Sequence, residues 1–397
     1  MTNIRPIISK RVFIVVAAMM LCLMADAKNP VIAPSWAWTP IPPLGLHEPA
    51  TIDTLMLNYA QESVPSIAVS PAYATTGNFG AEGLNMLFME RESPCDFFFF
   101  DALRPYLPFG KPQKFYNTRI PMTLLTYNTG GGKEAAQDRL KTIFSGNINA
   151  KAQVGMNLDY IYTKGSYNNQ ALKNLTWGIN GSYIGDRYEL QAALNHWNSL
   201  NKESGGITDD LYITDPAELQ GGQTSINPKS IPTRLQAAHS RVRGTELYIN
   251  NRYKVGYWHE EPVNDTTVNR TYIPVSTFVW TLQYNKGWHR FIDTSANDDS
   301  FWENTYLTAG GTNEITTYWS LRNTFGITVI EGFRPWVKAG LAAYITHEVR
   351  RFNQTTDTIR DNTAASLTPL PDFTIADRAT ENLVWAGVQL TKQTGKY

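Results

Sequence analysis

Apolar and polar residues alternate with a period of two along most of the chain after residue 118. In residues 154–163, for example, the apolar set is Val154, Met156, Leu158, Tyr160 and Tyr162. Successive side chains of a β-strand point to opposite faces, so this pattern predicts strands with one apolar and one polar face. About twelve such strands are predicted, at residues 119–128, 139–149, 153–163, 174–184, 188–197, 233–250, 252–260, 272–285, 288–293, 315–330, 333–349 and 381–391.

The connections between these strands alternate in length. Short turns are predicted near residue 150 and at 185–187, 250–251, 285–287 and 331–332, with longer loops between them. An up-and-down barrel gathers short turns at one end and long loops at the other, whereas a soluble Greek-key sandwich has no reason to separate them. The pattern therefore predicts an all-β fold, a transmembrane antiparallel up-and-down β-barrel of about 12 or more strands.

The two faces of the strands differ in the way that a membrane requires. The apolar faces are free of charge over roughly the ten residues that a strand needs to cross a bilayer, and a charge at mid-depth would cost about 2–4 kcal/mol. Polar groups inside a membrane must meet water or each other, so the polar faces are expected to line a wet lumen. The candidates for pore-lining residues are Asn157, Asp159, Asn180, Glu189, Gln191, Asn195, Gln283 and Lys338.

Aromatic residues gather toward the ends of the predicted strands. Tyr and Trp prefer the two membrane–water interfaces, where their rings meet both apolar and polar surroundings. The candidates for such lipid-interface girdles are Tyr160, Tyr162, Trp177, Tyr183, Tyr188, Trp280 and Tyr284.

Three regions follow from the sequence. Residues 1–27 have a basic start, an apolar run over 12–25 and the cleavage pattern Ala25-Asp26-Ala27, which predicts a signal peptide removed on secretion. Residues 28–113 are rich in proline and lack sustained alternation, so we expect an irregular periplasmic or plug-like segment. Residues 114–397 are assigned to the barrel.

Charge and cysteine content narrow the function classes. Removal of residues 1–27 takes away three Lys/Arg and one Asp, which leaves 32 basic and 34 acidic residues. This balance argues against a nucleic-acid partner, which requires a basic excess. Cys95 is the single cysteine after residue 27, so no internal disulfide is expected. The aromatic content of 12% fits an outer-membrane barrel, but it also fits a soluble periplasmic β-domain.

Motifs for chemistry are missing from the sequence. The six histidines are scattered without HxxxH spacing, and no G-x-S-x-G elbow is present. Asp209, Asp210 and Asp215 share a loop but lack the spacing of a calcium-binding loop. We therefore expect no enzyme activity, no cofactor, no metal site and no catalytic residue.

Four stretches carry a family likeness. They are residues 73–83 (YATTGNFGAEG), 115–134 (FYNTRIPMTLLTYNTGGGKE), 183–188 (YIGDRY) and 205–216 (GGITDDLYITDP). Together they resemble a porin family of Bacteroidota outer membranes, over residues 44–397. The resemblance implies an outer-membrane β-barrel without catalytic residues. Members of that family look longer, so a truncated member, with a barrel incomplete at the C-terminus, stays open beside a full-length protein.

The sequence thus predicts an outer-membrane porin that lets small hydrophilic solutes diffuse passively through a water-filled barrel. Its expected partners are outer-membrane lipid and those solutes. The alternative is an outer-membrane barrel that acts as an adhesin or assembly scaffold without an open pore, suggested by the long loops at 198–232, 294–314 and 350–379. The oligomeric state and the solute selectivity have no signal in the sequence.

Overall fold

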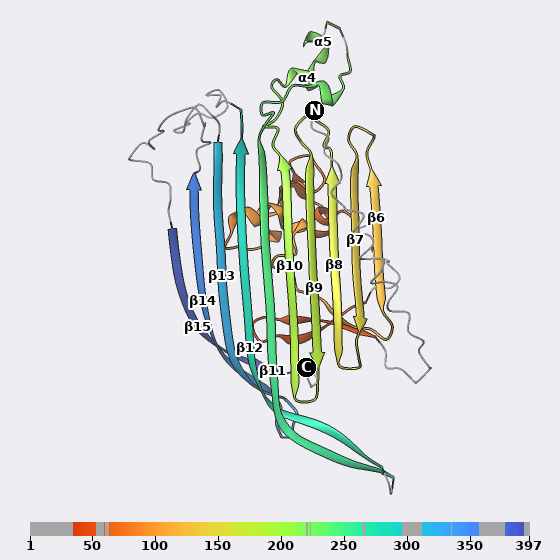
Figure 1. The fold of residues 1–397 in the computed structure, drawn as a ribbon, viewed down its shortest axis with the longest axis vertical. Coiled ribbons are helices and arrows are strands. Elements are labelled where there is room, and N and C mark those ends of the chain that lie inside the picture. Colours follow the sequence, from red (N-terminus) through yellow and green to blue (C-terminus); the bar gives the residue numbers. More distant parts are fainter. Residues whose placement is uncertain are drawn as a thin grey trace.

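The main element of the fold is a ten-stranded antiparallel sheet in which each strand pairs with the next one along the chain (Figure 1). A computed structural model describes residues 35–52, 59, 63–219, 221–222, 224–264, 267–295, 312–334, 336–356 and 378–392. The strands are β6 (Met122–Gly130), β7 (Gln137–Asn147), β8 (Ala152–Thr163), β9 (Leu172–Ile184), β10 (Tyr188–Lys202), β11 (His239–Asn264), β12 (Thr267–Asp293), β13 (Thr312–Val329), β14 (Gly340–Thr356) and β15 (Arg378–Thr391).

This meander confirms the predicted all-β antiparallel fold. The hydrogen-bonded order runs from β15 to β6, and within the described residues these two edge strands do not pair with each other. No helix among the described residues is long and apolar enough to cross a membrane. The predicted signal peptide, residues 1–27, lies outside the described part of the chain.

Two of the predicted turns are wrong, which is why the sheet has ten strands and not about twelve. Strand β11 continues through residues 250–251, and β12 continues through residues 285–287. The side chain of Asn250 is buried and donates a hydrogen bond to Thr281 Oγ1 at 2.7 Å. Gly287 lies directly opposite Gly244 in the β11–β12 ladder. These turn-prone residue types serve packing inside the strands here.

A third boundary also differs from the prediction. Strand β14 begins at Gly340 and not at residue 333, and residues 330–334 and 336–339 belong to the turn that follows β13. Lys338 is exposed in this turn, so its predicted place in a strand is wrong. The cause is local: Gly332 has a φ of 82°, and its amide closes the turn by donating to the Val337 carbonyl at 3.1 Å.

Connections of different length lie at opposite ends of the sheet. Residues 148–151 and 185–187 form short turns at one end. The loop at residues 203–238 lies at the other end and holds α4 (Leu211–Thr214), α5 (Pro216–Leu219) and η3 (Pro228–Ser230), as Figure 1 shows for the two α-helices. Residues 296–311 and 357–377, which make up most of two predicted loops, lie outside the described residues. We call the two ends the short-turn end and the long-loop end.

The sheet buries its polar face and exposes its apolar face. Along β10, Glu189, Gln191 and Asn195 are at most 5% exposed, whereas Tyr188 is 39% exposed. On β13 the apolar side chain of Phe325 is 56% exposed. We call the buried face the inner face and the exposed one the outer face. A soluble sheet would show the opposite arrangement, because water favours the burial of apolar side chains.

The inner face is covered by the N-terminal segment, residues 35–118. Its elements are β1 (Trp36–Ile41), β2 (Leu46–Ala50), α3 (Pro65–Val69), β3 (Tyr73–Thr75), β4 (Gly83–Asn85), η1 (Phe88–Glu90), η2 (Phe98–Tyr106) and β5 (Phe115–Asn117). Strands β2, β1 and β5 form a small sheet. In Figure 1 the N-terminal segment lies behind β8–β11, against the large sheet.

Apolar clusters attach the N-terminal segment to the sheet. In the largest, Phe97 and Phe100 pack with Trp197 of β10 and Tyr318 of β13. The Phe97 and Tyr318 rings are stacked with centroids 5.7 Å apart. A Cβ atom at Gly287 would overlap Phe97 and Phe100, so the glycine leaves the space that these rings fill. Buried aromatic pairs of this kind add about 0.5–1.5 kcal/mol each beyond the area that they bury.

The turn of the β1–β2 hairpin docks on polar side chains of the sheet. Thr281 Oγ1 donates to the carbonyl of Pro43 at 2.8 Å. Asn250 Nδ2 donates to the carbonyl of Leu44, and Gln191 Nε2 to that of Gly45, each at 3.3 Å. Side chains of the sheet thereby satisfy three backbone carbonyls of the hairpin turn, which avoids the cost of burying them unpaired.

We predict that Gly45→Ala loosens this hairpin. Gly45 has a φ of 66°, and an added Cβ would overlap the Asn250 side chain. Gly77→Ala is the matched control, because Gly77 also has a positive φ, 97°, but an added Cβ would meet nothing. Overpacking should make Gly45→Ala roughly 1–3 kcal/mol more costly than the control. Hydrogen exchange of residues 36–50 in the detergent-solubilised full chain measures the difference, and equal effects of the two substitutions would contradict the docking.

Candidate functional site

The candidate site is the inner face of the sheet, where an uncharged polar row crosses seven strands. Its members lie opposite one another in register and are all at most 6% exposed. They are Gln153, Ser182, Gln191, Asn250, Thr281, Thr324 and Thr346. Several bond to each other, as Thr324 and Thr346 do through their hydroxyls at 2.9 Å. The row is therefore a continuous hydrogen-bonding surface on which the β1–β2 turn lies.

Three groups of charged side chains on the inner face form ion pairs. Near the short-turn end, Glu189 accepts a hydrogen bond from Arg252 at 2.8 Å and also pairs with Lys254. On β7 and β8, Arg139 makes a bidentate pair with Asp159, with N–O distances of 2.6 and 3.0 Å. Buried ions are tolerated only when such partners offset the lost hydration.

A third charged group joins the sheet to the N-terminal segment. Glu348, 1% exposed, accepts from Arg322 at 2.9 Å and from Arg350 at 3.0 Å. Arg350 also pairs with Asp96 of the N-terminal segment at 3.0 Å. The Arg322 guanidinium lies over the Trp385 ring of β15, 5.5 Å from its centroid. Both signs of charge are present, so this part of the inner face has no strong single-sign field.

A neutral histidine lies between the hairpin and the sheet. His47 of β2 lies next to Gln191, with 2.5 Å between His47 Nε2 and the amide nitrogen. Burial lowers the pKa of His47 to about 4, although the Glu189 carboxylate acts in the opposite direction. The imidazole is therefore uncharged at neutral pH and adds no charge to the inner face.

Seven of the eight predicted pore-lining residues lie on the inner face. They are Asn157, Asp159, Asn180, Glu189, Gln191, Asn195 and Gln283. Gln191 and Asn195 contact the N-terminal segment, Asn195 through Gln113 at 3.4 Å. The eighth, Lys338, lies in the β13–β14 turn. Whether any of them borders a path for solutes stays a prediction.

The seven predicted interface aromatics lie on the outer face, as their alternation requires. These are Tyr160, Tyr162, Trp177, Tyr183, Tyr188, Trp280 and Tyr284. Tyr183 and Tyr188 flank a short turn, with ring centroids 6.2 Å apart. Trp177 lies in the middle of β9 and not near a strand end, where the interface aromatics are expected. Their contact with lipid headgroups stays a prediction.

Several inner-face residues were missed by the sequence analysis. The sequence predicts Asn250 in a turn and Arg252 at the start of the next strand, whereas both lie inside β11 and face inward. Arg322 and Glu348 have the correct parity for the inner face, but nothing local indicates that they pair across β13 and β14. The described residues contain no cluster of three or more His, Cys, Asp or Glu side chains that could hold a metal ion.

At the long-loop end, the N-terminal segment meets the sheet through a pair of acidic residues. Asn201 of β10 donates to Glu82 at 2.8 Å and to Glu203 at 3.2 Å. Burial raises the pKa of Glu82 to about 7, the Glu203 carboxylate acts in the same direction, and the bond from Asn201 opposes both. This contact therefore favours a protonated Glu82.

We predict that Glu189→Gln strongly destabilises the fold. The change leaves Arg252 buried and without its charged partner, and the loss of one member of a buried pair costs about 3–5 kcal/mol of stability. Asp186→Asn is the matched control, because Asp186 pairs with Lys151 on the surface, where both are about half exposed, and exposed pairs contribute about 0–1 kcal/mol. Urea unfolding in detergent micelles measures both losses, and a loss for Glu189→Gln no larger than that of the control would contradict the role of the buried pair.

We predict that docking near Glu82 weakens as the pH rises. A carboxyl whose pKa is about 7 in the folded state, above its unfolded value, contributes stability that is complete at low pH. That contribution is lost as the pH rises from the unfolded pKa through the folded pKa, and it levels off above that. Hydrogen exchange of residues 78–85, corrected for intrinsic rates between about pH 5 and 8, should show growing exposure. Glu82→Gln should remove this dependence, and Glu48→Gln, at an exposed position of β2, should retain it. Unchanged dependence in Glu82→Gln would overturn the assignment.

Comparison with known proteins bears directly on this site. No curated protein matches the chain. The sequence profile of a family described as "Putative porin" matches residues 37–397, which include the N-terminal segment and every strand of the sheet. The predicted family is confirmed by this match: the chain belongs to that porin family.

Proposed function

We propose that the protein is an outer-membrane porin whose large sheet forms the wall of a β-barrel and passes small hydrophilic solutes without enzyme activity or a cofactor. The observation that carries the proposal is the reversed polarity of the sheet, with a polar inner face and an apolar outer face. Lipid satisfies such an outer face, and a lumen satisfies such an inner face. Membership of a porin family supports the same function.

The distribution of charge on the outer face supports a membrane position. On β8, β13 and β14 the outer-face positions from the short-turn end to Tyr162, Ile315 and Val349 carry no Asp, Glu, Lys or Arg. The outer-face charges are found toward the long-loop end, on residues such as Lys286 and Arg351. Outer-membrane barrels have an apolar belt of about 25 Å on their lipid-facing side, and a charge-free band on these three strands is typical of it.

The N-terminal segment is proposed to act as a plug. It buries the inner face from β8 to β14 through apolar clusters, through the carbonyl bonds of the hairpin turn and through the Asp96–Arg350 pair. Toward β15 the inner face is more open, since Trp385 is 37% exposed and the Arg322 side chain 32%. We infer that solutes pass beside the N-terminal segment along the inner face of β15, past Trp385 and the Arg322 side chain.

A scaffold or adhesin without an open pore is the second candidate. Helices α4 and α5 project beyond the long-loop end (Figure 1). They expose Ile213 (60%) and Leu219 (40%), side chains that a partner could cover. Replacement of residues 209–226 by a short glycine-serine linker would remove this surface and leave the strands intact.

The mature full chain is expected to give stepwise single-channel conductance in planar bilayers. Trp385→Ala should raise the conductance, because it removes a large ring from the inner face. Val384→Ala is the matched control, since Val384 is the neighbouring residue on the outer face of the same strand, 65% exposed, and its conductance should equal that of the wild type.

Silence from a protein with the heat-shifted gel mobility of a folded barrel would overturn the pore and favour the scaffold. Equal conductance of Trp385→Ala and the wild type would overturn the proposed path along β15 but not the pore itself.

A further inference from the structure

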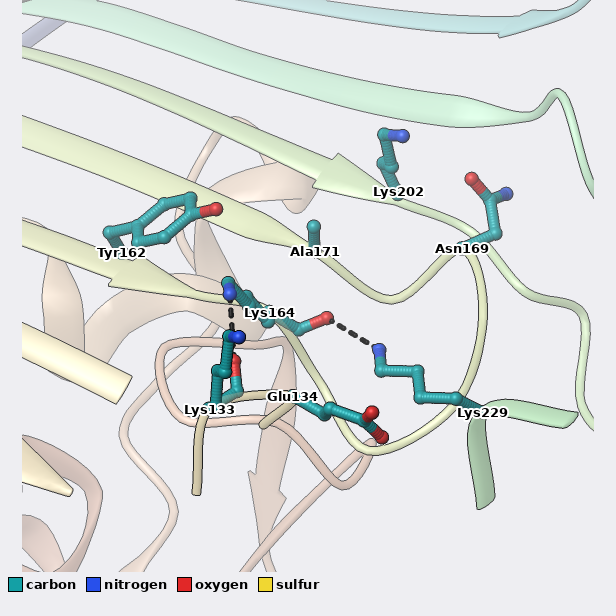
Figure 2. A pocket seen from close by; sticks show the side chains of 8 residues that line it. All are labelled: Lys133, Glu134, Tyr162, Lys164, Asn169, Ala171, Lys202 and Lys229. Carbon is teal, nitrogen blue, oxygen red and sulfur yellow. Dashed lines mark hydrogen bonds between the residues drawn. The ribbon is translucent and has the colours of Figure 1, made fainter. Parts of the chain in front are cut away.

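A basic pocket lies at the long-loop end of the sheet, away from the inner face (Figure 2). Its volume is about 510 Å³. Four of its eight lining residues are lysines and one is a glutamate. The lining residues are Lys133, Glu134, Tyr162, Lys164, Asn169, Ala171, Lys202 and Lys229. None of them belongs to the pore-lining set.

The pocket is an open depression on the outer face, bordered by loops. Tyr162 of β8 and Lys202 of β10 are outer-face residues, because they alternate with the buried Thr163 and Asn201. Lys133 and Glu134 come from the β6–β7 loop, and Lys229 comes from η3. Asn227 donates to Glu134 at 2.9 Å, which holds the two loops together.

The ammonium groups of the pocket that donate hydrogen bonds do so to backbone carbonyls and, among the described residues, not to carboxylates. Lys164 Nζ donates to the Lys133 carbonyl at 2.7 Å, and Lys229 Nζ donates to the carbonyls of Tyr167 at 2.7 Å and Lys164 at 3.2 Å. In the part of the chain that the structure describes, no carboxylate lies within ion-pair distance of Lys133, Lys164, Lys202 or Lys229. Four positive charges against one negative charge leave a field that attracts anions.

The titration of Lys229 agrees with this crowding. Burial lowers the pKa of Lys229, the Lys164 ammonium acts in the same direction, and only the Glu134 carboxylate opposes them. An anion in the pocket would relieve this repulsion between like charges.

The pocket continues into a basic belt around the same end of the outer face. The belt consists of Lys173, Arg241, Arg243, Lys286, Arg290 and Arg351. Guanidinium groups of the belt donate hydrogen bonds to neutral amides. Asn198 accepts from Arg241 at 2.8 Å and from Arg243 at 3.1 Å. Below the pocket, the outer face of β8 and β9 becomes apolar, with Val154 and Ile179 45% and 48% exposed.

We propose that this pocket binds the phosphate group of an anionic membrane lipid whose acyl chains lie on the apolar outer face of β8 and β9. The inference rests on the proposed membrane position of the sheet. Phosphate oxygens accept charge-assisted hydrogen bonds from lysine ammonium groups. A cationic pocket directly above an apolar wall matches a molecule with an anionic head and apolar tails, whereas a soluble phosphate would make no use of the wall.

The test uses the mature full chain in a non-ionic detergent, with lipid adducts counted by native mass spectrometry. Phosphatidic acid is the probe, and diacylglycerol is the same lipid without phosphate. The variant is Lys133→Gln with Lys202→Gln, because neither ammonium group donates a hydrogen bond within the described residues, so the loops keep their contacts. Lys151→Gln with Lys338→Gln is the matched control, since it removes two lysines at the short-turn end.

The wild type should bind phosphatidic acid, and the pocket variant should bind it about tenfold more weakly, because charge-assisted bonds to phosphate are roughly twice as strong as neutral ones. The control pair should remain within about twofold of the wild type, as expected for exposed charges. Equal binding by the pocket variant and the wild type would overturn the proposal. Displacement of the lipid by equimolar inorganic phosphate would also overturn it, by assigning the pocket to soluble anions.

The failure of this proposal and the failure of the porin function are distinguishable. If the wild type conducts and the pocket variant still binds phosphatidic acid as the wild type does, the lipid site alone is refuted. A silent but folded wild type that binds the lipid through these lysines refutes the pore alone.

Discussion

The difference in polarity between the two faces of one continuous sheet is the constraint on which the rest of the structure depends. A strand alternates strictly, so ten paired strands with the same parity create one apolar and one polar surface of equal extent. Neither surface can be left in the wrong medium, since buried polar groups need partners and exposed apolar area needs cover. The N-terminal segment partners the polar surface, and lipid is the medium that suits the apolar one.

Partnering the inner face takes several kinds of interaction. Carbonyls of the β1–β2 turn meet Gln191, Asn250 and Thr281, and aromatic rings fill the space left by Gly287. Charges are held in local pairs such as Glu189 with Arg252. These contacts together cover most of the inner face and leave the side of Trp385 exposed.

The two ends of the outer face differ in chemistry. Aromatic residues such as Tyr183 and Tyr188 lie at the short-turn end, whereas lysine and arginine dominate the long-loop end. A symmetrical bilayer would not require such a difference, but a membrane whose two leaflets carry different headgroups would. With the sheet in a membrane, as proposed above, this asymmetry would place the long loops on the side of the anionic headgroups.

The sequence by itself determined which residues share a face, because period-two alternation is a local property: seven of the eight pore-lining candidates and all seven aromatic candidates lie on the predicted faces. It failed at residues 250–251 and 285–287, where Asn and Gly indicate turns locally but serve long-range packing. Only the tertiary structure decided what covers the inner face and which charges pair, such as Arg322 with Glu348 or Arg350 with Asp96. Those contacts join residues up to 254 positions apart, and no local pattern encodes a partner at that separation.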